Sequence, residues 1–470
     1  MREFDVIVVG AGPAGIFTAL ELQKEAPQAR VLIVDAGSSI DRRNCPARKT
    51  GHCVGCQPCG IMQGWAGAGA FSDGKLSLSE EVGGNLPDYL PRQTVRDLIK
   101  YCDDQYLAFG APDLVHGLND PKVDEFKYEA SKYNIQLVPC PVRHMGTEYS
   151  FDVLRAMYRK LCQSDNFTFQ EFTTCENILT ENGAVTGVIL KKKSGETEQV
   201  AAKYVVAAPG RAGASWLTGV AHGAGISTLN NEVDIGVRVE VPNSVMDHLT
   251  KHLYEAKLVY YSDTFENKVR TFCMNPGGLV SEEHYDGKIA VVNGHSYADE
   301  ARHTENTNFA MLVSTKFTKP FDQPTEYGKY IAQLGNMLTG GGIMVQRLGD
   351  LLQGRRTDVS RLKKSTTIPT LTTAVPGDLS FVLPHRHLTS IIEAMRAFDH
   401  LAPGLYSKNT LLYGVEVKFY NMEVALDEHL ETAHRGLYVI GDGSGITHSL
   451  SHASASGVFV ARDILAQNAG

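Results

Sequence analysis

Phe4-Asp5-Val6-Ile7-Val8-Val9-Gly10-Ala11-Gly12-Pro13-Ala14-Gly15 joins a short apolar run to three closely spaced glycines at the start of the chain. The apolar run predicts a buried β-strand, and apolar residues at helical spacing over 16–22 predict a helix after it. In such a unit Gly10 permits a tight turn, Gly12 lets a pyrophosphate approach the backbone, and Gly15 lets the helix pack against its strand. The stretch therefore predicts a dinucleotide-binding strand-turn-helix unit.

A second apolar run, Val31-Leu32-Ile33-Val34, ends in Asp35. A carboxylate at this place accepts hydrogen bonds from ribose hydroxyls and would repel a 2′-phosphate. The N-terminus of the intervening helix offers free N–H groups and a positive dipole end to the phosphates. FAD or NAD is therefore expected rather than NADP.

Two later segments favour FAD, because a flavin must be held along its whole length. Residues 203–210 predict a buried strand that ends in a turn of small residues at Gly210, and residues 436–443 predict another that ends in Gly-Asp at Asp442. Asp442 can accept hydrogen bonds from ribityl hydroxyls. A helix expected over 446–465 would direct its positive N-terminal end toward the pyrimidine edge of the flavin.

Several longer strings are similar to those of a known family; they lie at 67–76, 235–240, 276–278 with 293–294, 346–350 and 441–447. Through them the chain resembles the uncharacterised FAD-dependent dehydrogenases of the glutathione-reductase-like flavoprotein superfamily. The resemblance covers nearly the whole chain. It implies an α/β fold, with a two-dinucleotide-fold-type FAD-binding Rossmann domain and an inserted α+β substrate domain.

The resemblance also implies which residues hold FAD. The ADP part would contact Gly10, Gly12, Ala14, Gly15 and Asp35; the loop beside the isoalloxazine or pyrophosphate would supply Gly67, Gly69, Ala70 and Ser72; Gly210, Asp442, Gly445 and Ile446 would complete the cradle.

The expected FAD-binding domain consists of residues 1–211 and 431–470, and the inserted substrate or cap domain of residues 212–430. Strand-like runs at 233–241, 257–261, 269–274 and 288–292 predict an antiparallel sheet in the insertion. No second strand followed by a GxGxxG turn is found, so a dedicated NAD(P)H domain is not expected. The default place for a substrate pocket is between the two domains.

Four of the nine cysteines, Cys45, Cys53, Cys56 and Cys59, lie within the segment 45–59. Their spacing approximates the ligands of a 4Fe-4S cluster, although the Cys-Pro pair comes before the triplet instead of after it. Four thiolates also suit tetrahedral zinc. A redox pair, Cys53/Cys56 or Cys56/Cys59, and four thiols without a ligand are the other two interpretations. The sequence leaves all four open.

Three histidines are candidates for proton transfer. His448 and His452 are four residues apart and are expected just inside the last helix, on one face. An imidazole titrates near neutral pH and can pass the proton that accompanies hydride transfer. Capping and packing are the alternative roles. His295, which follows Asn293-Gly294, is a third candidate on the same reasoning.

The formal net charge of −8 argues against a nucleic-acid partner. The absence of a run of about 18 apolar residues and of a signal peptide predicts a cytoplasmic protein without a membrane partner.

We expect an FAD-dependent oxidoreductase, a dehydrogenase or C=C reductase, that transfers hydride between flavin N5 and a small organic substrate. If the cysteines hold iron, a cluster would relay electrons to ferredoxin or another carrier. The alternatives are a thiol-disulfide reductase that uses Cys53, Cys56 and Cys59, and a tRNA-modifying FAD protein, which the acidic charge disfavours.

Overall fold

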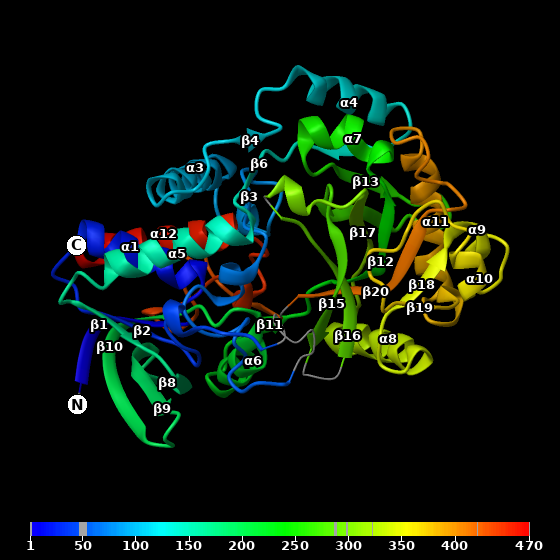
Figure 1. Cartoon of the computed structure of the whole chain (residues 1–470). Helices are drawn as coiled ribbons and strands as arrows, with labels where there is room; N and C mark the ends of the chain where they lie inside the picture. The colour runs from blue at the N-terminus through cyan, green and yellow to red at the C-terminus, as the bar shows by residue number, and fades with distance from the viewer. Residues whose placement is uncertain are drawn as a thin grey trace. The chain divides into compact units, whose positions relative to one another are not determined.

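The computed structural model describes residues 2–46, 54–285, 289–297, 299–321, 323–420 and 422–469 (Figure 1). The chain divides into two compact units. The first consists of Met1–Leu114, Arg143–Asn231 and Asn421–Gly470, and the second of Val115–Val142 and Glu232–Tyr420. No helix in the described ranges has the length and apolar content needed to cross a lipid bilayer.

The unit boundaries differ from the expected insertion over 212–430 at three places. Residues 212–231 and 421–430 lie in the first unit, and residues 115–142 lie in the second. Long-range pairing explains the last difference, because strand 136–138 pairs with strand 257–261. Residues of the helix over 214–223 pack into a core of the first unit, which explains why the first unit extends past residue 211.

The first unit is built on a seven-stranded sheet in the order β7-β2-β1-β10-β9-β8, with β22 beside β10. Strands β7, β2, β1, β10 and β22 are parallel, whereas β8 and β9 form an antiparallel hairpin that continues onto β10. The strands are β1 (Arg2–Val9), β2 (Val31–Val34), β7 (Phe167–Gln170), β8 (Thr173–Glu181), β9 (Ala184–Lys192), β10 (Thr197–Ala207) and β22 (Leu437–Val439). The helices are α1 (Pro13–Glu25), α3 (Arg92–Ala108), α5 (Gly146–Leu161), α6 (Ala214–Gly223) and α12 (Leu450–Ala469).

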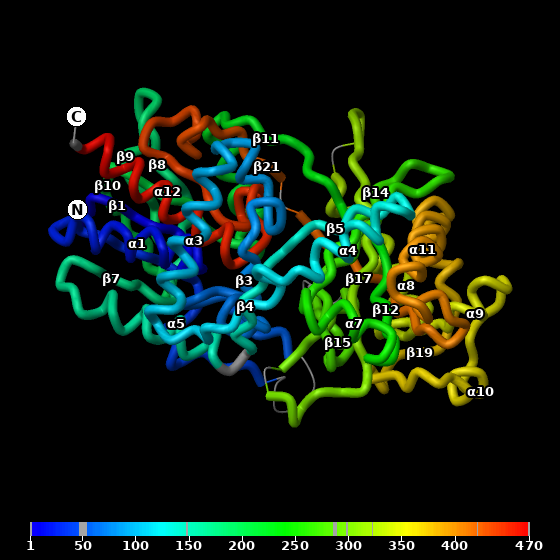
Figure 2. The backbone as a smooth tube through the Cα atoms, turned by 90° about the horizontal axis from the view of Figure 1, so that it is seen from above, coloured from blue at the N-terminus to red at the C-terminus, as the bar shows by residue number. Residues whose placement is uncertain are grey.

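The predicted order of strand, glycine turn, helix and strand is confirmed in β1, α1 and β2. The C-terminal helix α12 lies beside α1 in both views (Figures 1 and 2). Gly457 permits this close approach, because a Cβ there would lie 2.2 Å from the carbonyl oxygen of Ala14. The C-terminal segment thereby covers the helix that starts at the glycine turn.

The second unit contains an eight-stranded sheet in the order β19-β18-β20-β12-β17-β14-β13-β5 and a separate hairpin, β15–β16. The strands are β5 (Gln136–Val138), β12 (Val233–Pro242), β13 (Lys257–Tyr261), β14 (Lys268–Asn275), β15 (Leu279–Tyr285), β16 (Ile289–His295), β17 (Asn306–Thr315), β18 (Met344–Arg347), β19 (Val375–Pro376) and β20 (Leu411–Phe419). The helices are α4 (Pro121–Ser131), α7 (Asn243–Leu253), α8 (Pro324–Thr339), α9 (Leu348–Leu351), α10 (Val359–Leu362) and α11 (His385–Phe398). Shorter strands elsewhere are β3 (Lys75–Ser77), β4 (Val115–His116), β6 (Val142–His144), β11 (Thr228–Leu229) and β21 (Glu423–Val424).

The central strand β12 is buried on both faces. Its odd-numbered residues, from Val233 to Val241, join the apolar core. Its even-numbered residues include Asp234, Arg238 and Glu240, which are equally buried. Buried charges must be paired and hydrogen-bonded to be tolerated, so the polar face of this sheet is held by specific contacts.

A histidine in α11 should make the second unit sensitive to acid. His387 is buried, its Nε2 lies 3.0 Å from the hydroxyl of Thr315, and burial, assisted by Arg386, lowers its pKa to about 4. In the unfolded chain a histidine titrates near 6.5, so the unfolded state takes up the proton first as the pH falls. The free energy of unfolding should therefore decrease by up to about 3 kcal/mol between pH 7 and pH 4 because of this residue alone.

Urea unfolding of His387→Gln over this pH range tests that expectation, since glutamine does not titrate. The loss of stability toward pH 4 should become smaller in His387→Gln and stay unchanged in His385→Gln, which replaces an exposed histidine in the same helix. An equal acid dependence in wild type and His387→Gln would show that His387 does not cause it.

Candidate functional site

The turn between β1 and α1 has the geometry that a dinucleotide needs. Gly10 has a φ of +110°, and a Cβ there would lie 2.1 Å from the carbonyl oxygen of Ala208. A Cβ on Gly15 would lie 2.2 Å from the carbonyl oxygen of Gly10. Gly12 differs, because no atom of the described residues lies within 4 Å of its Cβ position. Gly10 and Gly15 are thus needed for packing, and Gly12 borders open space.

The first turn of α1 faces this open space without a side-chain cap. Gly12 is the N-cap residue, Pro13 follows it, and the first turn contains no acidic residue. The N–H groups and the positive dipole end of this thirteen-residue helix are therefore available to an anion. The donor set fits a diphosphate.

Gly67 borders the same turn, and Gly210 follows the strand that reaches it. The Cβ position of Gly67 lies 3.5 Å from the Cα of Gly12, and the Cβ position of Gly210 has no described atom within 4 Å. Strand β10 brings Gly210 here, since it runs parallel to β1 and the N–H of Ala208 donates to the carbonyl of Val9 (2.8 Å). The structure thus brings Gly67 and Ala208, two residues before Gly210, to the glycine turn.

Asp35 ties three loop segments together. Its Oδ2 accepts from the N–H of Ala11 (2.9 Å), and its Oδ1 accepts from the N–H groups of Gly37 (2.8 Å) and Gly64 (2.7 Å). A carboxylate has about four acceptor positions, so one position on Oδ2 remains for a ribose hydroxyl. The sequence predicts only the ribose contact; the structure adds this positioning role.

Replacing Asp35 with alanine should therefore destabilise the protein even without a ligand. Three N–H groups would lose a charged acceptor, and we expect the free energy of unfolding to fall by roughly 3 kcal/mol. Asp35→Asn, which keeps one carbonyl oxygen, should lose less. Urea unfolding of the flavin-free protein measures both, with Asp97→Ala on the exposed face of α3 as the matched control. Unchanged stability in Asp35→Ala would contradict this role.

Arg43 organises the loop that leads to Gly67. Its Nε and Nη2 donate to the carbonyl of Gly60 (3.2 and 3.1 Å), and Nη2 also donates to that of Ile61 (2.5 Å). Its Nη1 donates to the carbonyls of Trp65 and Gly67 (both 2.6 Å). The guanidinium group thus makes five hydrogen bonds to the backbone of one loop.

Arg43 is buried and stands over the ring of Phe71, 4.8 Å from its centre. Burial lowers its pKa to about 10, and Asp35 and Cys59 oppose that shift, so it stays charged at neutral pH. The sequence interpretation missed Arg43. Nothing in an Arg-Arg pair predicts that one member will bind backbone carbonyls.

The other residues expected in the flavin loop have mainly internal contacts. Gly69 and Ala70 are buried in the short helix Gly67–Phe71. The hydroxyl of Ser72 donates to the carbonyl of Gly69 (3.0 Å) and accepts from the N–H of Gly74 (3.1 Å). This network fixes the turn after the loop.

The segment after β22 reaches the same end of the sheet as the glycine turn. The Cβ position of Gly441 lies 3.0 Å from the Cβ of Ala14. Burial raises the pKa of Asp442, opposed by Arg211 at 3.9 Å and by the hydroxyl of Thr447 at 3.2 Å. Ile446 and Gly445 are buried, and Gly445 accepts a hydrogen bond from Asn231 (2.9 Å) through its carbonyl oxygen.

The expected helical pairing of two histidines is wrong. Helix α12 begins at Leu450, so His448 precedes the helix; its N–H donates to the carbonyl of Gly83 (2.7 Å). His452 lies in the first turn and is fully buried. Its Nε2 lies 3.1 Å from the carbonyl oxygen of Ser79, which can only accept, so Nε2 carries the proton.

Burial lowers the pKa of His452, opposed by its bond to Ser79 and by Glu80. Its Nδ1 has no hydrogen-bond partner among the described residues. A neutral, enclosed imidazole favours the packing role. His295 is at the end of β16 in the second unit, with its ring edge-on to that of Tyr297 (centroids 4.9 Å apart).

The cysteine segment does not assemble a metal site in the described residues. Cys45, Cys56 and Cys59 are free thiols, and Cys53 lies outside the described ranges. No three potential ligands come together anywhere in the part of the chain that the structure describes. The iron–sulfur and zinc hypotheses therefore receive no support from these residues.

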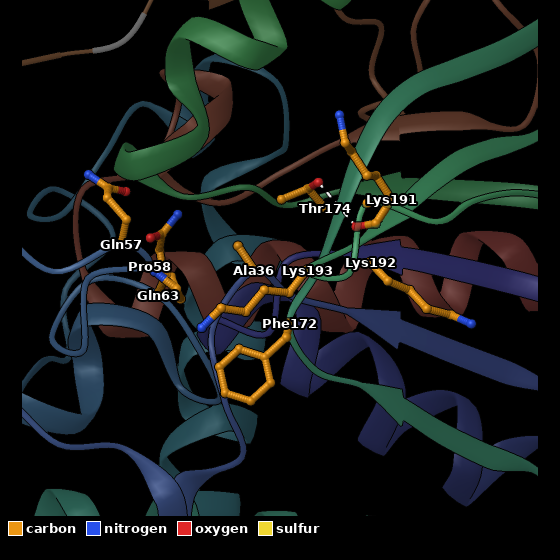
Figure 3. Close-up of a pocket in the computed structure, with 10 residues that line it drawn as sticks. Ala36, Gln57, Pro58, Gln63, Phe172, Thr174, Lys191, Lys192 and Lys193 are labelled. Carbon is orange, nitrogen blue, oxygen red and sulfur yellow. Dashed lines mark hydrogen bonds between the residues drawn. The ribbon is translucent and has the colours of Figure 1, made fainter.

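A cavity of about 320 Å³ lies beside Ala36, the residue after Asp35 (Figure 3). Its walls come from Gln57, Pro58 and Gln63 on one side and from the hairpin residues Phe172, Thr174, Lys191, Lys192, Lys193 and Gly195 on the other. Lys193 stands over the Phe172 ring, 5.2 Å from its centre. The cavity volume is at the lower end of the range for small-molecule sites.

Two overlapping stretches of the chain match models of known protein families. Residues 109–258 match the model of an FAD binding domain, and residues 232–419 match that of the family described as FAD-dependent protein, C-terminal domain-like. An uncharacterized protein of Clostridium beijerinckii is 26% identical, with 98% of this chain and 80% of that protein covered.

Solved structures similar to the chain include a quinol-fumarate reductase with menaquinol molecules (14% identity, TM-score 0.43, 100% of this chain and 72% of that one). Another is a formate oxidase of Aspergillus oryzae (12% identity, TM-score 0.46, 100% and 99%). The glycine turn fits a dinucleotide, and the two family models specify FAD. The two matches identify the chain as an FAD-dependent protein, similar over residues 232–419 to the C-terminal domain-like family.

Proposed function

We propose that the protein transfers hydride between N5 of FAD and a small organic substrate, as a dehydrogenase or C=C reductase. The observation that carries the proposal is the open space at Gly12, at the uncapped start of α1 and beside Gly67. When bound, FAD supplies a two-electron carrier that accepts or donates hydride.

Each part of FAD has a proposed place in the first unit. The diphosphate would lie at the first turn of α1, and the adenosine ribose would donate to the remaining acceptor position of Asp35. The adenine would enter the cavity beside Ala36, over Phe172. Asp442 would accept from the ribityl chain.

Hydride transfer to or from carbon also requires a proton carrier. We assign this role to His448 rather than His452, because His452 is enclosed and its lowered pKa keeps it neutral. His295 is the second candidate for the proton carrier. The pH profile of flavin reoxidation should change in His448→Gln, and an unchanged profile would remove His448 from this role.

The purified protein tests the proposal. We expect a yellow protein that releases all of its flavin on acid precipitation. After anaerobic reduction, its flavin should be reoxidised by an unsaturated organic acceptor faster than free reduced FAD is. Folded protein that stays colourless and takes up no added FAD would contradict cofactor binding. Bound FAD that no organic donor or acceptor reduces or reoxidises would contradict the reaction.

A thiol-disulfide reductase is the second candidate, because Cys56 and Cys59 are free and half-buried and Cys59 lies on the loop next to Arg43. Cys56→Ser/Cys59→Ser should abolish turnover if the thiols react and leave it unchanged under hydride transfer to an organic substrate.

Iron and zinc analysis of anaerobically purified protein decides between the iron–sulfur and zinc hypotheses for the cysteine segment. Iron would support a relay to ferredoxin or another carrier.

A further inference from the structure

We propose that the second unit binds an anionic oxygen group, a carboxylate or a phosphoryl group, on the face of its sheet around Phe272. Under the proposed function, on which this assignment of a role rests, the site identifies the substrate as a small organic acid or phosphate ester. The binding claim itself depends only on residues of the second unit.

Three cations from three strands converge on one aromatic ring. The Nζ of Lys257 on β13 lies 4.7 Å from the centre of the Phe272 ring, and the Nζ of Lys418 on β20 lies 5.4 Å from it. The guanidinium carbon of Arg270, on β14 like Phe272, lies 4.9 Å away. Strands β12 and β17 separate β14 from β20, so the cluster spans the centre of the sheet.

The carboxylates that pair with these cations lie deeper than the cations do. Lys257 pairs with Glu255 (2.6 Å), and Lys418 pairs with Glu416 (3.3 Å). The two lysine side chains are 10% and 12% exposed, compared with 5% and 0% for their partners. The two lysine side chains are therefore slightly more exposed than the carboxylates with which they pair.

Arg270 follows the same arrangement. It pairs with Asp234 at 2.5 Å, and the two side chains are 22% and 1% exposed. Glu232, half-buried at the start of β12, adds a further negative charge near Arg270. The guanidinium group is again the more accessible member of the pair.

One of the cations is not required to neutralise its partner. Glu416 already receives Nε and Nη2 of the fully buried Arg238, at 2.8 and 2.7 Å. Asp234 already accepts from the hydroxyls of Ser314 and Tyr420, both at 2.6 Å. Lys418 therefore adds positive charge beyond what Glu416 needs, whereas Arg270 is the cation that pairs with Asp234 and donates beside these two hydroxyls.

Such a cluster suits an anion with two or more oxygens. An arginine can bind a carboxylate or a phosphate through a planar fork, and lysines add point charges from the sides. Partial burial strengthens each of these contacts relative to the same contact in water. A neutral ligand of the same shape would gain none of this attraction between opposite charges.

Isothermal titration of the protein as purified tests the proposal with succinate, benzoate and inorganic phosphate as probes. Succinamide and benzamide are the neutral counterparts. We expect at least one anion to bind and the amides not to bind. A preference for the carboxylates would identify an organic acid as the ligand, and a preference for phosphate would identify a phosphate ester.

Lys418→Met is the main variant, because Glu416 keeps Arg238 and the fold should survive. It should weaken anion binding about tenfold. Lys257→Met/Glu255→Gln removes a second cation together with its partner and should have a similar effect. Lys268→Met, on the exposed part of β14, is the control and should bind as the wild type does.

The proposal is overturned if none of the three anions binds, if the amides bind as well as the acids, or if Lys418→Met binds as tightly as wild type. Binding is measured without turnover, so its failure is separate from failure of the proposed function. A protein that binds succinate but does not transfer hydride would disprove only the reaction. A protein that transfers hydride but binds no anion would disprove only this site.

Discussion

Gly12→Glu is expected to abolish FAD binding and to leave the protein folded. No described atom lies within 4 Å of the Cβ position of Gly12, so the new side chain has room. It would place a carboxylate at the first turn of α1, where the diphosphate is proposed to lie. Like charges in direct contact cost several kcal/mol, and about 4 kcal/mol corresponds to roughly a thousandfold loss of affinity. Flavin content and FAD titration of the apo-protein measure the effect.

Substitutions at two other glycines distinguish loss of FAD binding from loss of folding. Gly219 in α6 also has open space at its Cβ position, so Gly219→Glu should fold and keep its flavin. Gly15→Val should fail differently, by loss of soluble folded protein, because its Cβ would lie 2.2 Å from the backbone of Gly10. A Gly12→Glu protein that retains stoichiometric FAD would remove the diphosphate from this turn.

The glycine turn could be predicted because its determinants are local. A buried strand, a tight turn and a helix start lie within a few residues of one another, and each glycine has one physical reason. The strands predicted before Gly210 and Asp442 are also confirmed, as β10 and β22, which pair in parallel. The sequence could not assign the three N–H groups that Asp35 binds, because Gly64 reaches it from another loop.

Features that depend on distant contacts were predicted less well. Helix α12 begins later than the sequence predicts. Thr447 forms a bridge with Gly84, and this bridge keeps residues 446–449 out of the helix. Residues 115–142 were assigned to the wrong unit because β5 finds its partner, β13, more than a hundred residues later. Neither contact leaves a signal in the local pattern.

Strand β12 shows another limit of prediction from the sequence pattern. The alternation in Ile235-Gly236-Val237-Arg238-Val239-Glu240 indicates a strand, and β12 confirms it. Alternation usually indicates that one face meets water. Here both faces are buried, because Arg238 pairs with Glu416 and Glu240 accepts from the hydroxyl of Tyr413. The pattern gives the element correctly and leaves the partners of its charged residues unknown.

Arg43→Met is expected to cause the largest loss of stability among the substitutions at the cofactor loop. The variant loses five hydrogen bonds and leaves four loop carbonyls without their charged donor. A buried polar group left without a partner costs about 1 to 3 kcal/mol, so a total near 4 kcal/mol is expected after partial access of water. The loop would no longer hold Gly67 against Gly12, and flavin content should fall as well.

Two further variants test the cause of this loss: Arg43→Lys keeps the positive charge without the planar set of donors, and Arg42→Met is the control on the neighbouring surface arginine. Lysine keeps the charge but has three donors on one nitrogen, which cannot replace a planar fork aimed at carbonyls from Gly60 to Gly67, so most of the loss should remain. Arg42 is exposed and pairs with Glu171 on the surface, and its replacement should cost less than about 1 kcal/mol. Full stability and flavin content in Arg43→Lys would show that positive charge, rather than the set of donors, holds the loop. Full stability in Arg43→Met would show that the loop keeps its conformation without the positive charge and without the donors of Arg43.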